Sequence, residues 1–327
     1  MAKMTMVQAL NLALRQEMEK DDRVIVLGED VGLDGGVFRV TEGLFQQFGE
    51  TRVVDTPLAE SGIVGMSIGM AVYGLRPVCE IQFSGFDYHN FHQIENHAAR
   101  LRWRSQGRFS VPMVLRAPYG GGVRALEHHS ESREVFWAHI PGIKMVIPSG
   151  PRNARALLVS AIRDPDPVIF YEPKALYRAF REDVPEEEET LPLGRSQVVR
   201  EGKDLTLIAY GAMMRPALAA ADELKEKNGI EAELIDLLTI SPLDDTLFVQ
   251  SVKKTGHAMI IHEAPQSFGP GAEVVARLVE KAFFHLEAPI ARVTGYDITI
   301  PLFSREHAYL PNAARIVHSA RVLLSTP

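Results

Sequence analysis

The sequence predicts a protein of two α/β domains, each built on a mainly parallel sheet. Short β-branched runs alternate with helical patterns along most of the chain, and such alternation is typical of βαβ units. Its 327 residues are enough for two domains of ordinary size. An acidic run flanked by prolines interrupts the pattern, and a second alternating unit follows it. We therefore expect domains over 1–180 and 195–327, joined by a solvated acidic linker over 181–194.

The elements of the first domain follow from hydrophobic periodicity. Runs rich in β-branched and apolar residues predict strands at 24–28, 77–83, 111–116, 144–148 and 167–172. Helical patterns lie at 6–20, 59–73, 87–104 and 151–163.

The second domain repeats this rhythm. Strands are predicted at 204–211, 232–237, 258–263 and 289–295, with helices near 213–227, 243–254 and 271–286. Alternation of this kind again favours a parallel sheet.

Composition excludes several classes of protein. A net charge of −7 argues against a nucleic-acid binder, which would carry a basic stripe. No apolar run approaches the roughly 20 residues that span a bilayer. The single cysteine, Cys79, excludes a disulfide framework and a cysteine-based zinc site. We expect a cytoplasmic protein with no signal peptide.

The stretch 55–71 is the most informative. Glu60 stands where a short strand gives way to a helix that carries Gly62, Gly65 and Gly69. A helix this apolar is expected to be buried on most sides, and its glycines suggest the close approach of another backbone. The Glu60 carboxylate then either caps the helix, where the dipole favours it, or takes part in chemistry.

Other polar side chains also stand at predicted strand ends, where open α/β sheets bind ligands. They are Glu29, Asp30, Gln82, His128 and His129, and Phe86 follows Gln82 closely. Ionisable groups gathered at such an edge suggest a reactive site.

Two glycine-rich loops allow more than one interpretation. The loop at 28–36 could cradle phosphate, but it lacks the spacing of a dinucleotide fingerprint and the lysine of a P-loop. It could equally be a loop held by tight turns. The loop at 119–122 could be a lid beside a reactive centre or a surface excursion.

The adjacent His128 and His129 suggest a metal site only weakly. Adjacent side chains diverge in extended structure, and no third ligand stands at a recognisable spacing. A histidine that handles protons or contacts an oxyanion is the stronger interpretation, and a surface histidine is the alternative.

Six sequence blocks occur in one order along the chain. They are GEDVGLDGGVFRVTEGL (28–44), DTPLAESGIVG (55–65), EIQFSGF (80–86), RAPYGGGV (116–123), HSES (129–132) and IRDPDPVIFYEPKALYR (162–178). Together they resemble the beta subunit of the thiamine-diphosphate-dependent decarboxylase component of 2-oxoacid dehydrogenase complexes. The likeness covers nearly the whole chain, and the second domain is similar to the transketolase C-terminal domain.

The resemblance implies an assembly of two alpha and two beta chains. The alpha chain would hold the diphosphate and its magnesium through a GDG-type motif, which is missing from this sequence. The beta chain's first domain would receive the aminopyrimidine. A lipoyl acyltransferase would dock through its peripheral binding domain. The implied reaction is oxidative decarboxylation of a 2-oxo acid with acyl transfer to lipoyl-lysine, and pyruvate is slightly favoured over branched-chain substrates.

The resemblance also implies the site residues. Glu60 would hydrogen-bond the pyrimidine ring nitrogen and favour the imino tautomer that removes the thiazolium proton. Glu29, Leu58 and Gln82 would bind the cofactor. Phe86 would stack on it and His129 would serve the substrate, although this chain reads HSES where HSQS is common and has an extra histidine before it.

The segment 161–166 resembles a monovalent-cation loop of some family members. Ala161, Asp164 and Asp166 are the candidate potassium ligands. The alternative is a proline turn before a strand.

Two other functions stay open at this point. One is a split, transketolase-like thiamine enzyme. The other is a scaffold subunit without chemistry, although buried ionisable groups at strand ends argue against it.

Overall fold

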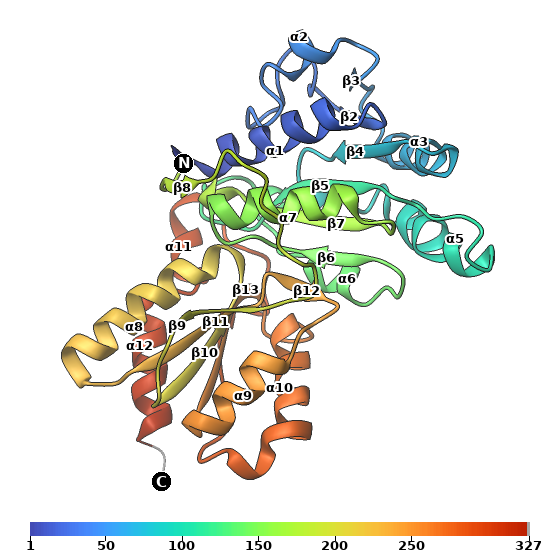
Figure 1. Ribbon diagram of the computed structural model, residues 1–327. Coiled ribbons are helices and arrows are strands. Elements are labelled where there is room, and N and C mark those ends of the chain that lie inside the picture. Colours follow the sequence, from blue (N-terminus) through green and yellow to red (C-terminus); the bar gives the residue numbers. More distant parts are fainter. Residues whose placement is uncertain (326–327) are drawn as a thin grey trace. The chain divides into compact units, whose positions relative to one another are not determined.

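The computed structural model describes residues 1–325, which form two compact α/β units (Figure 1). The first unit comprises Met1–Tyr119 and Phe136–Leu193, and the second comprises Gly120–Val135 and the chain from Gly194 onward. The predicted fold class is confirmed, since both sheets are mainly parallel. A single boundary along the sequence would place residues 120–135 in the first unit, whereas they cluster with the second.

The main sheet of the first unit has its strands in the order β6-β7-β5-β4-β2-β3, and all neighbours are parallel. The strands are β2 (Val24–Gly28), β3 (Val53–Asp55), β4 (Arg76–Glu80), β5 (Val114–Tyr119), β6 (Lys144–Val146) and β7 (Val168–Pro173). Every residue of β2, β5 and β7 is buried. Strands covered on both faces are near-continuous apolar runs, as the sequence shows.

Local signals set the ends of the main helices. Helix α1 (Met6–Lys20) begins after a capping box between Thr5 and Gln8. Helix α7 (Pro151–Arg163) begins with Pro151, whose missing N–H costs nothing there. Helix α3 (Glu60–Tyr73) ends at Gly74, which has a φ of +109°. Helices α1 and α7 pack against each other in Figure 1.

The predicted helix at 87–104 is interrupted. It consists of α4 (Phe91–Gln93), a π-helical turn η2 (Ile94–Ala98) and α5 (Ala99–Arg104). Further short elements are α2 (Leu44–Phe48), η1 (Ser84–Phe86), α6 (Glu134–Ala138) and η4 (Lys174–Leu176).

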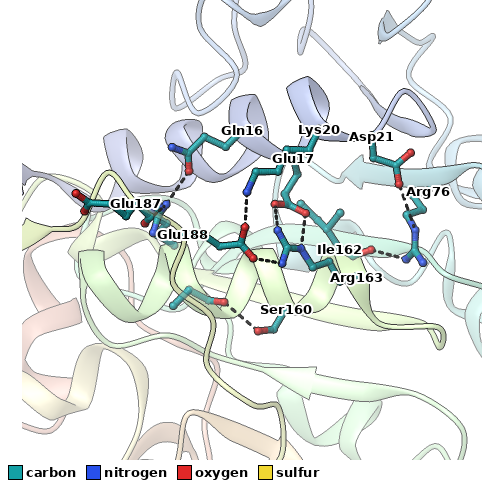
Figure 2. A network of polar contacts seen from close by, with 12 residues as sticks. Gln16, Glu17, Lys20, Asp21, Arg76, Ser160, Ile162, Arg163, Glu187 and Glu188 are labelled. Carbon is teal, nitrogen blue, oxygen red and sulfur yellow. Dashed lines mark hydrogen bonds and ion pairs between the residues drawn. The ribbon is translucent and has the colours of Figure 1, made fainter.

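The acidic run is exposed but fastened to the first unit. Strand β8 (Glu182–Val184) pairs antiparallel with β1 (Ala2–Met4). Glu188 forms ion pairs with Lys20 of α1 and Arg163 of α7, and Arg163 also holds Glu17 at 2.7 Å (Figure 2). These charges form a network rather than isolated surface pairs. The acidic run therefore links α1 to α7, in addition to leading into the second unit.

The second unit has the strand order β14-β13-β10-β11-β9, in which only β9 is antiparallel. The strands are β9 (Gln197–Arg200), β10 (Leu205–Ala209), β11 (Ala232–Asp236), β13 (Ala258–Pro265) and β14 (Ala291–Gly295). Helices α8 (Met214–Asn228) and α12 (Ala313–Leu324) pack together on one face, and α9 (Thr246–Thr255) and α10 (Pro270–Ala282) on the other (Figure 1).

Shorter elements complete the second unit. They are η3 (Glu127–His129), η5 (Gly211–Met213), β12 (Thr239–Ser241), η6 (Phe283–His285), η7 (Phe303–Arg305) and α11 (Glu306–Tyr309). Within residues 1–325, none of the helices has the length and apolar character needed to cross a membrane.

Candidate active site

Three predicted site residues leave neighbouring strands at one edge of the first sheet. Gly28, the last residue of β2, pairs with Asp55 of β3 on one side and with Glu80 of β4 on the other. Because these strands are parallel, Glu29, Glu60 and Gln82 emerge at the same edge. The topology thus gathers side chains that are far apart in sequence.

Glu60 is the first residue of α3, and its side chain is buried, with 7% exposed. Ala59 occupies the N-cap position and makes no side-chain capping bond. Glu60 therefore does not cap the helix in the strict sense, although the helix dipole favours its charge at this position.

Glu29 lies directly after β2 and is buried to a similar extent. Burial raises the pKa of its carboxyl, and the negative charges of Glu60 and Asp30 raise it further. Its Oε1 atom is buried without a hydrogen-bond partner among the described residues. The edge therefore holds two neighbouring carboxyls, one of which retains its proton more readily than an ordinary glutamate.

Gln82 is half-buried beyond the end of β4. Its Nε2 donates to Oδ2 of Asp30 at 2.9 Å, which ties the segment after β4 to the segment after β2. Asp30 has a φ of +57°, so the chain turns sharply at this point.

The glycine-rich loop at 28–36 is held by the protein's own carboxylate. Asp55 accepts hydrogen bonds from the backbone N–H groups of Gly32, at 2.6 Å, and Leu33, at 3.2 Å. A Cβ atom on Gly32 would lie 2.6 Å from Asp55 Oδ2, so a larger residue there would displace this carboxylate. These two amides already donate to Asp55 and are unavailable to a phosphate. This favours the interpretation of 28–36 as a loop held by tight turns over its interpretation as a phosphate-binding loop.

Helix α3 corrects the expectation that it is buried on most sides. Tyr73 is 89% exposed and Met66 is 45% exposed. A Cβ atom on Gly69 would meet no atom within 4 Å, and one on Gly62 would meet only the Ala59 side chain. The predicted close backbone approach is therefore absent in the described residues of this chain, and one apolar face of the helix is open.

Phe86 ends the short helix η1 and is half-buried against Phe83, with ring centroids 6.2 Å apart. The next residue, Asp87, is buried and accepts hydrogen bonds from Trp137 Nε1, at 3.2 Å, and from the Tyr171 hydroxyl. These contacts fix the backbone that carries Phe86. Sequence reasoning missed Asp87, although an acid directly after the aromatic residue was its available signal.

Leu58, the predicted apolar contact, is 79% exposed in the turn before α3. A single exposed leucine is common on protein surfaces and does not by itself indicate a partner.

A buried charge cluster lies against the same glycine-rich loop, and it also went unpredicted. Arg116 of β5 binds Glu172 through two hydrogen bonds of 2.6 and 3.0 Å and Glu80 through one of 2.8 Å. Burial raises the pKa of Glu80 despite the opposing charge of Arg116. A Cβ atom on Gly36 would lie 3.4 Å from Glu80 Oε1, so the cluster lies next to the loop at 28–36.

His128 and His129 lie in the second unit, in the 3₁₀ turn η3. Their ring centroids are 4.1 Å apart, so the rings contact each other instead of diverging. The expectation of divergence assumed extended backbone, whereas a tight turn brings adjacent side chains together. Within residues 1–325, no group of three histidine, cysteine or acidic side chains could hold a metal ion. The structure assigns both histidines to the second unit and Glu29, Glu60, Gln82 and Phe86 to the first.

The carboxylates of the candidate potassium segment bind cationic side chains. Asp164 accepts a hydrogen bond from Lys144 Nζ at 2.6 Å, and Asp166 forms an ion pair with Arg102. The carbonyl of Ala161 accepts the Asp164 N–H at 3.3 Å, as in a turn.

Comparisons with known proteins extend over the whole chain. A family model described as the transketolase pyrimidine-binding domain matches residues 2–179, and one described as the transketolase C-terminal domain matches 194–316. The chain is 52% identical over 323 residues to the pyruvate dehydrogenase E1 component subunit beta of Acholeplasma laidlawii, covering 99% of this chain and 98% of that protein. It is 52% identical over 324 residues to the same subunit of Bacillus subtilis strain 168, covering 99% of each.

A solved structure has the same fold. It is a split-gene transketolase described as an inactive beta4 tetramer, with a TM-score of 0.81, 22% sequence identity and 99% coverage of both chains. At this identity the likeness concerns the fold alone.

Proposed function

Because the chain belongs to the family of pyruvate dehydrogenase E1 component beta subunits, we propose that it acts with an alpha subunit to decarboxylate pyruvate, using thiamine diphosphate whose aminopyrimidine half it binds. The family makes the chain an enzyme subunit, which leaves the scaffold hypothesis without support. The split-transketolase alternative has only a similarity of fold in its favour.

The observation that carries this proposal is the pair of buried carboxyls, Glu29 and Glu60, at one edge of the sheet. Glu29 Oε1 is a buried acceptor without a partner among residues 1–325, and such atoms usually await a ligand or water. The amino group and ring nitrogens of an aminopyrimidine suit two carboxyls of this kind. Bound thiamine diphosphate would supply the nucleophilic carbon that the reaction needs.

The residues of this chain would bind and orient the aminopyrimidine half of the cofactor and exchange a proton with it. Glu60 would hold the pyrimidine ring nitrogen by a hydrogen bond and share a proton with it. Glu29 would supply the second carboxyl of the pair, and burial together with the charges of Glu60 and Asp30 raises its pKa. Gln82 is oriented by Asp30, and Phe86 offers a ring face for stacking. The exposed Leu58 adds apolar contact.

His129 serves the substrate in this proposal. Its imidazole donates a hydrogen bond to the carboxylate of the 2-oxo acid, or passes a proton during acyl transfer to the lipoyl group.

Several partners belong to the proposal. Two alpha and two beta chains assemble, and the alpha chain holds magnesium and the diphosphate, since this sequence has no GDG motif. The open apolar face of α3 suits such an assembly. The second domain receives the peripheral binding domain of the acyltransferase. Potassium binds at 161–166 through backbone carbonyls and an aspartate, with Ala161, Asp164 and Asp166 as the candidate ligands. The buried Cys79 suits a reducing cytoplasm.

Coexpression with the alpha partner tests the function. We expect thiamine diphosphate to bind tightly only when both chains are present, and pyruvate to be decarboxylated faster than a branched-chain 2-oxo acid. Faster turnover of the branched-chain acid would overturn the substrate assignment. Equally tight cofactor binding by the alpha chain alone would overturn the role of this chain in cofactor binding.

A further inference from the structure

The glycine-rich loop that leads to His129 is gripped by two buried carboxylates of the second unit. Glu263 of β13 accepts a hydrogen bond from the backbone N–H of Gly121 at 2.7 Å. Glu306, the first residue of α11, accepts one from Gly122 at 2.9 Å and one from Arg124 at 2.8 Å. Both glutamates are only 3% exposed. Three backbone amides within residues 121–124 therefore donate hydrogen bonds to two glutamates that are distant in sequence.

The backbone fits these carboxylates closely. Gly120, Gly122 and Arg124 have φ values of +79°, +94° and +58°, so the loop turns sharply where its amides meet the two carboxylates. A Cβ atom on Gly120 would lie 2.6 Å from Glu263 Oε1, and one on Gly121 would lie 3.1 Å from Glu306 Oε1. The glycines of this loop thus allow it to approach the protein's own carboxylates.

The far end of the same segment is held as well. The hydroxyl of Tyr210 donates to Glu134 Oε1 at 2.6 Å, and Glu134 is fully buried. Ser130, directly after His129, is also buried. The segments on both sides of η3 are therefore held by hydrogen bonds within the second unit.

We propose that Glu306 and Glu263 are positioning residues for His129. They hold the loop through charge-assisted hydrogen bonds, which are stronger than neutral ones, and so set the direction in which the imidazole points. The inference rests on the proposed role of His129 toward the substrate. Glu306 carries the larger share, because it takes two of the three amides.

Replacing Glu306 with glutamine tests this role, because the side-chain amide keeps the shape but turns one acceptor into a donor facing a backbone N–H. In the complex with the alpha subunit, we expect Glu306→Gln to lower kcat/KM for pyruvate by about 10- to 100-fold, as misplacement of a catalytic group does. The affinity for thiamine diphosphate should change less than twofold. The matched control is Glu273→Gln, on the exposed side of α10, where only an ion pair with Arg277 is lost.

A double-mutant cycle separates positioning from general destabilisation. If Glu306 acts through His129, Glu306→Gln should cost almost nothing further in a His129→Ala background. Full additivity would overturn the inference. A His129→Ala variant with normal activity would instead overturn the proposed role of His129. If the Glu306 variant fails to assemble, the same cycle with Glu263→Gln decides the question by the same criterion.

Discussion

Burial raises the pKa of the Glu29 carboxyl, and the negative charge of neighbouring Glu60 raises it further. The two residues follow adjacent parallel strands, so their closeness is a consequence of the sheet order. Two like-charged groups in one buried place resist being ionised together.

Replacing Glu60 with glutamine should leave the fold intact but lower decarboxylation by about 10²-fold or more, the range contributed by positioned proton transfer. The measurement is pyruvate decarboxylation by the reconstituted complex, with circular dichroism to check folding. The exposed Glu50→Gln variant is the control. Near-normal turnover by the Glu60 variant would rule out its proton role.

Glu29 should make stability fall as pH rises. Its pKa is raised in the folded state, so the folded protein binds the proton more tightly than the unfolded chain does. The loss of stability caused by ionising Glu29 is absent below the usual glutamate pKa. It grows as pH rises through the raised pKa of the folded state and is complete above it. Glu29→Gln should therefore raise the melting temperature at neutral pH and leave it unchanged at acid pH. The opposite trend in thermal scans across this range would contradict the assignment.

The two histidines provide a matched pair of variants. His129→Ala should damage decarboxylation or reductive acylation of lipoamide far more than His128→Ala, because only the former is expected to face the substrate. Because the two imidazole rings contact each other, either alanine variant should show the same small loss of packing. Equal and mild losses in the two assays would reject the assignment of His129.

Potassium at 161–166 predicts a cation-dependent melting temperature. Exchanging potassium for a large organic cation at equal ionic strength should lower the melting temperature, because binding to the folded state alone stabilises it. The ion pair of Asp166 with Arg102 is exposed enough to respond to ionic strength, which must stay fixed. An unchanged melting temperature would favour a simple proline turn.

The buried Arg116 should be essential for stability. Arg116→Met leaves Glu80 and Glu172 buried without their cation, and breaking such a pair costs about 3–5 kcal/mol. Urea unfolding of the complex measures the loss. Arg23→Met is the surface control, since its ion pair with Asp21 is well exposed. A loss no larger than that of the control would mean that the cluster contributes little.

Much of the fold could be predicted from periodicity. The strand at 24–28 and the helices at 6–20 and 151–163 have the bounds predicted for them. The helix at 313–324 went unpredicted, and the helix at 87–104 has a π-helical turn within it. Periodicity records which residues are buried, but interruptions of the helical hydrogen bonding leave little trace in it.

The candidate site could be predicted in part. Position after a strand indicated Glu29, Glu60 and Gln82, because parallel strands end at one edge. Asp87, Arg116 and Glu306 could not be found in this way. Each acts through partners more than 30 residues away in sequence, and such pairings depend on strand order and loop path.

The sequence by itself determined two α/β domains and the strand ends that carry the ionisable groups. Only the tertiary structure decided that 120–135 belongs to the second unit, that Asp55 occupies the amides of the glycine-rich loop, and that one face of α3 is open. The physical reason is the separation along the chain over which the deciding interactions act. Propensity and periodicity act between neighbours in the chain, whereas a buried carboxylate is satisfied by whichever amide the completed fold brings to it.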